Sequence, residues 1–346
     1  MTIQKKLEAH ISNDDDMPQG VVSLESESGS FDLPEGVQMS LRKCTDITCS
    51  SSEGRNELSL SECDSVTIKD FKNGVIRLEK CDQVEEITCT EGTTLTVSAS
   101  KITKADCKNA TVIMIDCEIE DGKFEDCEIT SIKNKFQKVE LTGGVIQSED
   151  DEFQDECTFT DLKSATIVNG EFKGKITGDG SVFHLHAVKS EDEVKLTDCN
   201  FTDVTGEYKE KFTVDGDKST CMLKGTKIDE KVEITDGSLM ATALELKEEL
   251  TVTGSIVSLT DLKAEKEVTI EKSQVVITGG EFNDKTTITS CSARLLSCKF
   301  SDDVTIEKGA TDSEKNEFEK KLELTGGTIE SKRDKFSDDV TLTDLI

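Results

Sequence analysis

Residues 268–285 read VTIEKSQVVITGGEFNDK, and this stretch decides the fold. Its apolar side chains fall in three groups about six residues apart. A pattern such as Val-Thr-Ile has a period of two, which places its first and third side chains on one face of a β-strand. Glycine pairs such as Gly279-Gly280 indicate corners between strands. The stretch therefore predicts one coil of three short strands. Its predicted inward side chains are Val268, Ile270, Val275, Ile277 and Phe282.

The same pattern recurs at a fixed spacing along the chain. Phenylalanines stand 18 residues apart at Phe282, Phe300, Phe318 and Phe336. The segments 299–305 and 335–341 are both KFSDDVT, two periods apart. Towards the N-terminus the steps vary from about 17 to 20 residues, as insertions at corners would produce. About sixteen such repeats fill residues 44–346.

Repeats of this length predict a stack of coils. One 18-residue unit cannot bury its own apolar face, whereas neighbouring coils bury it between them, with equivalent residues aligned in ladders. We therefore predict an all-β fold, a parallel β-helix or β-solenoid, over residues 44–346. Residues 1–43 are predicted to be an irregular N-terminal segment. Coils built by one chain and coils intertwined among three chains in a trimer both fit the pattern.

The composition restricts the classes of partner. The formal net charge of the 346-residue chain is −31, and nucleic acids bind to cationic surfaces. Nucleic acid is therefore not an expected partner. Neither a signal sequence nor the roughly 18 consecutive apolar residues of a membrane-spanning helix is found, so a soluble product is expected.

Pairs of acidic residues raise the question of catalysis. Asp150-Asp151, Asp302-Asp303 and Asp338-Asp339 could act as the carboxylates of a glycosidase. Such enzymes also need a wide groove and aromatic platforms for sugar, but the coils are tight and aromatic residues make up only 4%. Solvated corners are the better interpretation of these pairs, and we expect no enzyme.

The thirteen cysteines fit the predicted ladders. Cys63 and Cys81 are 18 residues apart, as are Cys89 and Cys107. Free cysteine is among the most buried residue types, so we expect buried thiols. Disulfides between neighbouring coils or chains, and a metal site, remain alternatives. A mixed-ligand zinc site is poorly supplied, because the chain has only three histidines.

The most distinctive local pattern is Phe183-His184-Leu185-His186. Alternation places the imidazoles of His184 and His186 on the same side of one strand. If that side faces solvent, they are ordinary surface residues. If it faces a threefold axis, three chains would present six imidazoles, which suit iron or another transition metal. His184 and His186 are therefore candidate metal ligands.

A strongly acidic, helix-poor solenoid with a His-x-His strand resembles the central spike proteins of contractile phage tails and related injection machines. The resemblance implies a homotrimer in the virion whose rigid needle helps to pierce the host envelope, with iron held by His184 and His186. It also implies that residues 1–43, with the acidic run 14–16, contact the tail tube or baseplate proteins. A capping protein would cover the C-terminal coil.

The chain also resembles bactofilins, cytoskeletal proteins with coils of 17 to 18 residues, in the segment 170–176 (GEFKGKI). This resemblance implies a cytoplasmic scaffold that polymerises end to end. A third alternative is a glycan-acting tailspike, which long loops and exposed aromatic rows would indicate. The spike is the first interpretation, the scaffold the second and the glycan enzyme the third.

Overall fold

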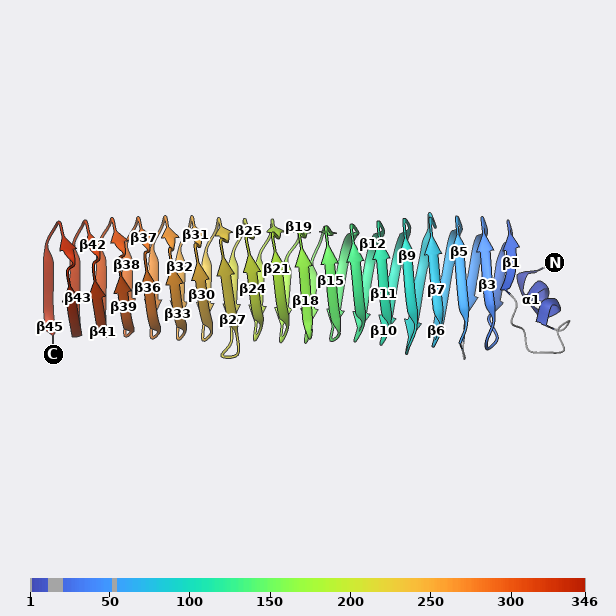
Figure 1. The fold of residues 1–346 in the computed structure, drawn as a ribbon, viewed down its shortest axis with the longest axis horizontal. Coiled ribbons are helices and arrows are strands. Elements are labelled where there is room, and N and C mark those ends of the chain that lie inside the picture. Colours follow the sequence, from blue (N-terminus) through green and yellow to red (C-terminus); the bar gives the residue numbers. More distant parts are fainter. Residues whose placement is uncertain (1, 12–20, 52–54, 346) are drawn as a thin grey trace. The chain divides into compact units, whose positions relative to one another are not determined.

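The computed structural model describes residues 2–11, 21–51 and 55–345. These residues form a parallel β-solenoid with about 18 turns of about 18 residues, 2% helical and 64% strand. The predicted fold class is therefore confirmed, and the described turns slightly exceed the predicted sixteen. The chain divides into two compact units, residues 1–171 and 172–346. Each unit is described here by itself, and Figure 1 shows the strands of each stacked side by side.

Unit 1 (residues 1–171) builds each coil mainly from two strands. One set has five residues per strand: β1 (Val21–Glu25), β3 (Gln38–Arg42), β5 (Glu57–Ser61), β7 (Val75–Glu79), β9 (Thr94–Ser98), β11 (Thr111–Ile115), β13 (Glu128–Ile132), β15 (Val145–Glu149) and β18 (Ser164–Val168). The other set varies from four to nine residues: β2 (Gly29–Asp32), β4 (Thr45–Ser50), β6 (Asp64–Lys72), β8 (Val84–Thr90), β10 (Lys101–Lys108), β12 (Glu118–Glu125), β14 (Lys135–Thr142) and β17 (Cys157–Thr160). The short β16 (Glu152–Phe153) pairs with the first residues of β14.

The first coil of unit 1 begins earlier than the sequence predicts. Strand β1 pairs in parallel with β3, and β3 pairs with β5, so residues 21–42 already belong to the stack. Helix α1 (Ile3–Ile11) lies against β2, with Ile3 and Leu7 fully buried. The predicted irregular segment 1–43 therefore contains a helix and three solenoid strands. Its acidic run, 14–16, lies outside the described residues.

Unit 2 (residues 172–346) separates each coil into three strands. The four-residue strands are β20 (Ile176–Asp179), β23 (Val194–Thr197), β26 (Phe212–Asp215), β29 (Val232–Thr235), β32 (Leu250–Thr253), β35 (Val268–Glu271) and β38 (Thr286–Thr289). The five-residue strands are β21 (Val182–His186), β24 (Asn200–Val204), β27 (Thr220–Lys224), β30 (Ser238–Thr242), β33 (Ile256–Thr260), β36 (Gln274–Thr278) and β39 (Ser292–Leu296).

Two-residue strands complete the coils of unit 2: β22 (Lys189–Ser190), β25 (Glu207–Tyr208), β28 (Lys227–Ile228), β31 (Glu245–Leu246), β34 (Lys263–Ala264), β37 (Glu281–Phe282), β40 (Lys299–Phe300), β42 (Glu317–Phe318) and β44 (Lys335–Phe336). The equally short β19 (Glu171–Phe172) contains the boundary between the units. In the last coils the four- and five-residue strands merge. The merged strands are β41 (Val304–Glu314), β43 (Leu322–Lys332) and β45 (Val340–Leu345).

The core of unit 2 consists of the predicted inward residues. All five inward candidates of residues 268–285 are at most 2% exposed. Phe282, Phe300, Phe318 and Phe336 are register partners from coil to coil. Their rings stack with centroids 4.7, 5.0 and 5.3 Å apart. Because these partners lie one coil apart in the same chain, each coil is built by one chain and not by three intertwined chains.

Corners depend on residues with left-handed backbone conformation. In the coil containing β32 and β33, Gly254 has φ +67° and Asp261 has φ 53°. The residue after each, Ser255 and Leu262, is buried. The Ser255 hydroxyl donates to the Thr253 carbonyl at 2.9 Å and accepts the Gly237 N–H at 3.3 Å, so it joins two coils. The corners therefore supply hydrogen bonds as well as changes of direction.

Candidate functional site

His184 and His186 lie on the outer side of β21. The side chains between and before them, Phe183 and Leu185, are buried, whereas both imidazoles are exposed. Alternation therefore places the two histidines on one side, as predicted, and that side faces away from the core. Within the described residues, no group of three His, Cys, Asp or Glu side chains could hold a metal ion. A site completed by other copies of the chain stays a prediction.

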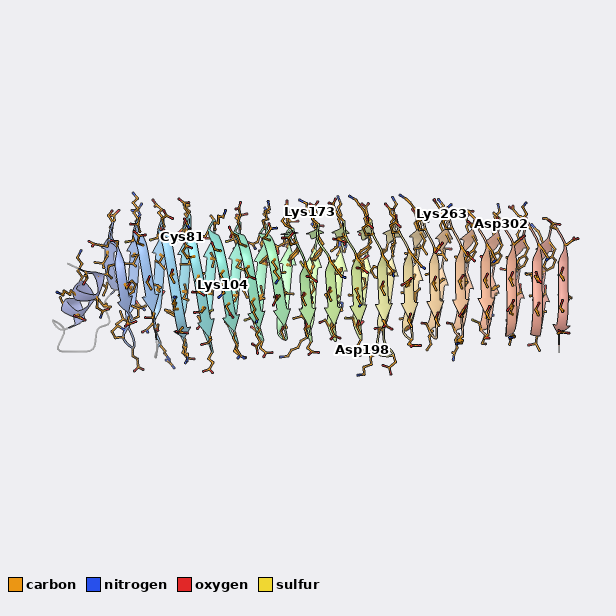
Figure 2. All side chains as sticks on the ribbon, turned by 180° about the vertical axis from the view of Figure 1, so that it is seen from behind. Cys81, Lys104, Lys173, Asp198, Lys263 and Asp302 are labelled. Carbon is orange, nitrogen blue, oxygen red and sulfur yellow. The ribbon has the colours of Figure 1, made fainter. Side chains whose placement is uncertain are left out.

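Two of the three acidic pairs form solvent-facing corners. The Asp303 N–H donates to Asp302 Oδ1 at 2.7 Å, and the Asp339 N–H donates to Asp338 Oδ1 at 2.8 Å. Such side-chain to backbone bonds are typical of Asx turns. Figure 2 shows Asp302 at the same edge of unit 2 as Lys173 and Lys263, with their side chains directed away from the coils. These pairs agree with the corner interpretation.

The third pair differs, because Asp151 is buried and not solvated. Its Oδ1 accepts the Asn134 N–H at 2.6 Å, and its Oδ2 accepts the Ser148 hydroxyl at 2.6 Å. Burial raises the pKa of Asp151, while these bonds act in the opposite direction. The corner interpretation is therefore wrong for Asp151, which belongs to a buried hydrogen-bond network.

That network continues one coil earlier through Asn134. Its Oδ1 accepts the Cys117 N–H at 2.8 Å, and its Nδ2 donates to the Met114 carbonyl at 2.9 Å and the Ser131 hydroxyl at 2.8 Å. All donors and acceptors of this amide are satisfied inside the coil stack. We call Asn134 and Asp151 the corner ladder of unit 1.

Unit 2 repeats the arrangement with Asn316 and Asp334. The Asn316 N–H donates to Asp334 Oδ1 at 2.8 Å, and Asn316 Oδ1 accepts the Cys298 N–H at 2.8 Å. The sequence analysis missed both ladders. Their signal is Ser-x-x-Asn followed one coil later by Ser-x-x-Asp. It occurs at 131–134 with 148–151 and at 313–316 with 331–334.

A carboxyl group also occupies an inward position of β24. Asp203 is the register partner of Leu185 and Leu223, so it interrupts an apolar column. Its Oδ2 accepts the Thr226 hydroxyl at 2.7 Å and the Gly206 N–H at 3.1 Å. Its Oδ1 and the hydroxyl of the neighbouring Tyr208 are buried without a hydrogen-bond partner. Burial raises the pKa of Asp203, because the charged form loses hydration.

The thirteen cysteines are all free and buried. Cys89 and Cys107 are register partners, with their Sγ atoms 3.1 Å apart. Burial raises the pKa of the Cys127 thiol to about 11. Thiols that are buried and protonated react slowly, because the thiolate is the nucleophile. The prediction of buried thiols is confirmed, and these residues serve packing.

In the described parts of the chain, helix α1 is too short to cross a membrane, and no other helix could do so. Nor does comparison with known proteins assign the chain to a family. No protein-family model, curated protein or solved structure matches it.

Proposed function

We propose that this protein is a structural, non-enzymatic element that works through the stiffness of its solenoid. The observation that supports this most directly is the in-register ladder of buried side chains in each unit. In unit 2 the stacked rings of Phe282, Phe300 and Phe318 belong to such a column. Backbone hydrogen bonds connect each coil to the next, so bending a unit must distort many packed contacts at once.

The outer surface supports the non-enzymatic interpretation. A hollow of about 620 Å³ lies on the outer sides of β33, β36, β39, β41 and β43. Its charged lining residues are Arg294, Asp312 and Glu330, which follow one another in a single register column. Arg294 Nε lies 3.5 Å from Asp312 Oδ2, so the cation pairs with the first carboxylate. This arrangement is typical of a surface ion pair more than of an acid and base held for catalysis.

The first candidate setting is the central spike of a contractile phage tail or a related injection machine. In that setting three copies of the chain form the needle, and the N-terminal segment contacts tail tube or baseplate proteins. A capping protein would cover the coil that exposes Phe336, Val340 and Leu342. Iron would bind His184 and His186 between copies, from the outer sides of their strands.

A polymerising, bactofilin-like scaffold is the second candidate. The construction of each coil from one chain favours it over an intertwined needle, because such a solenoid is complete without partner strands. In this setting the protein would act in the cytoplasm. A glycan-acting tailspike is the weakest of the three proposals.

Sedimentation velocity combined with mass measurement of the full chain tests these candidates. A compact trimer supports the spike, and long polymers support the scaffold. A particle that remains monomeric at every concentration contradicts both settings. Elemental analysis of the trimer, with the double variant His184→Ala/His186→Ala as control, decides the metal proposal. Iron lost in that variant supports it, whereas equal iron in both proteins overturns it.

A further inference from the structure

One outer face of unit 2 lacks the negative charge that dominates the chain. It is formed by the outward side chains, three per strand, of the five-residue strands β24, β27, β30, β33, β36 and β39, and we call it the neutral face. None of these side chains is acidic, and only Lys224 and Arg294 are cationic. In a chain of net charge −31, such a region is unusual.

The other sides of the same coils are charged. The four-residue strands present Asp215, Glu233 and Glu271 outward. The two-residue strands and the loops after them include runs such as residues 245–249, ELKEE. Figure 2 shows Lys263 projecting outward from this charged edge. The neutral face is therefore a property of one side of the coil and not of this part of the sequence as a whole.

Apolar side chains are exposed on the neutral face. Met222, Met240, Ile256 and Val276 are 42%, 41%, 59% and 42% exposed. Outward positions of a strand tolerate polar residues without cost to the core, so folding of the coil does not require these four side chains. The adjacent hollow of about 620 Å³ is lined by the small residues Ser258, Ser292 and Ala310 among others. Exposed apolar side chains beside a hollow indicate a contact surface.

The net charge of the chain favours a second copy of itself as the partner. Two copies repel each other at long range, and most sides would bring carboxylates together. The neutral face is the surface on which two copies can approach without burying acidic side chains. Two such sheets can pack face to face at a separation of about 10 Å.

The order of residues along the face selects the orientation. We propose that two copies pair through their neutral faces with antiparallel solenoids, related by a two-fold axis that runs along β33. This axis places Met240 opposite Val276 of the second copy and Met222 opposite Arg294. Beyond the face it places His184 opposite Glu330. The facing pairs follow from the register of the strands on either side of β33.

Parallel pairing about an axis along the solenoid is less favourable. It would place Arg294 opposite Arg294, Asp312 opposite Asp312 and Glu330 opposite Glu330. Like charges directly opposite each other destabilise a contact. Charge complementarity therefore selects the antiparallel pair.

The size of the face sets the expected strength. Six strands about 4.8 Å apart and about 16 Å long cover roughly 460 Å² in projection. Specific interfaces bury about 600 to 1,000 Å² of accessible surface per partner, so this contact is near the lower limit. We expect a reversible dimer that forms on the order of micromolar concentration.

Charge reversal tests the face. In the double variant Met240→Glu/Val276→Glu, both new carboxylates face outward and oppose each other across the dimer. The matched control, Thr251→Glu/Thr287→Glu, adds the same charge on the outer side of β32 and β38. Sedimentation velocity across a concentration series should show a loss of dimer of at least tenfold in association constant for the first variant. The control should fall much less. Equal loss in both, or none in either, overturns the proposal.

A cross-linking experiment tests the axis independently. Ser258 is exposed and lies on the proposed two-fold axis, so Ser258→Cys would place two thiols opposite each other. Oxidised glutathione should convert them to one intermolecular disulfide, with two equivalents of reduced glutathione released. The thirteen native cysteines are buried, and Thr269→Cys on β35 is the control. Covalent dimer from Ser258→Cys alone supports the axis, and its absence overturns it.

This inference goes beyond the proposed function and can fail separately. A trimer or polymer that is insensitive to both face variants would retain the structural function and overturn the neutral-face contact. A dimer dissociated only by Met240→Glu/Val276→Glu, without larger assemblies, would support this contact and contradict both the spike and the scaffold.

Discussion

At the scale of single residues, the phenylalanine column gives the simplest prediction. Phe300 lies fully buried between Phe282 and Phe318. Phe300→Asp should lower the free energy of unfolding by several kcal/mol, about 3 or more, because it buries an unpaired charge and leaves a void. Urea unfolding followed by circular dichroism measures the change. The control, Ser292→Asp, adds the same group at an exposed outward site in the same coil. Similar stabilities of the two variants would contradict the inward column.

Asp203 gives the opposite prediction. In Asp203→Asn the carbonyl can keep the bonds from Thr226 and Gly206, while the new amide N–H₂ can donate to the Tyr208 hydroxyl. The substitution removes a buried charge and satisfies two orphaned groups. The free energy of unfolding should therefore rise at pH 7, by about 1 to 3 kcal/mol.

The pH dependence of that difference is a further test of Asp203. Its pKa is raised in the folded state, so its favourable contribution is fully present below the pKa of the unfolded chain. That contribution is lost as the pH rises through the folded-state pKa. The advantage of Asp203→Asn should consequently disappear as the pH falls towards 3 to 4, the range in which an unfolded aspartate protonates. Urea unfolding of both proteins across this range measures it, and a constant difference would contradict burial of the charge.

At the scale of the strand and its corner, the asparagines are the critical residues. Asn316→Ala removes the bonds to the Cys298 N–H and the Leu295 carbonyl and leaves both groups unpaired in the core. The expected loss is about 2 to 4 kcal/mol in the free energy of unfolding. Asn283→Ala, at an exposed position, is the matched control and should change it little. Denaturant unfolding that fails to separate these two variants would contradict the corner ladder.

Corner glycines differ in the space around them. Gly144 and Gly225 have φ +69° and +62°, but a Cβ at Gly144 would lie 2.2 Å from the Cys127 carbonyl oxygen. At Gly225 the nearest contact is Thr205 Cγ2 at 3.6 Å. Gly225→Ala should therefore cost only the left-handed strain, about 1 to 2 kcal/mol, and Gly144→Ala distinctly more. Thermal unfolding of the two variants compares them, and equal losses would show that coil spacing does not limit the corner.

These elements show how far the sequence predicts the structure. Phe282 and Val268 were identified as inward residues because both spacing and alternation repeat in every coil. Asp151 and Asp203 could not be, because a polar residue is stable inside only where a neighbouring coil supplies donors. The start of the stack at Val21 was missed because spacing is irregular there. The outward direction of His184 follows from its buried neighbours Phe183 and Leu185.

At the scale of the whole molecule, net charge controls stability. A charge of −31 repels itself within each folded unit, and added salt screens that repulsion. Raising sodium chloride from low concentration to about 0.5 M should therefore raise the urea midpoint. Exposed lysine–glutamate pairs such as Lys231–Glu233 and Lys299–Glu319 weaken in salt, but each contributes little. A midpoint that falls with salt would mean that these pairs outweigh the net repulsion.

The constant step of unit 2 makes its size adjustable in fixed increments. Residues 268–285 form one complete winding, and the residues at equivalent places on either side are its register partners. A duplication or deletion of those eighteen codons would leave every remaining column aligned, whereas a change of seventeen would invert each following side chain between inside and outside. A gene of this kind can therefore lengthen or shorten its product like a ruler, one graduation of about 4.8 Å at a time.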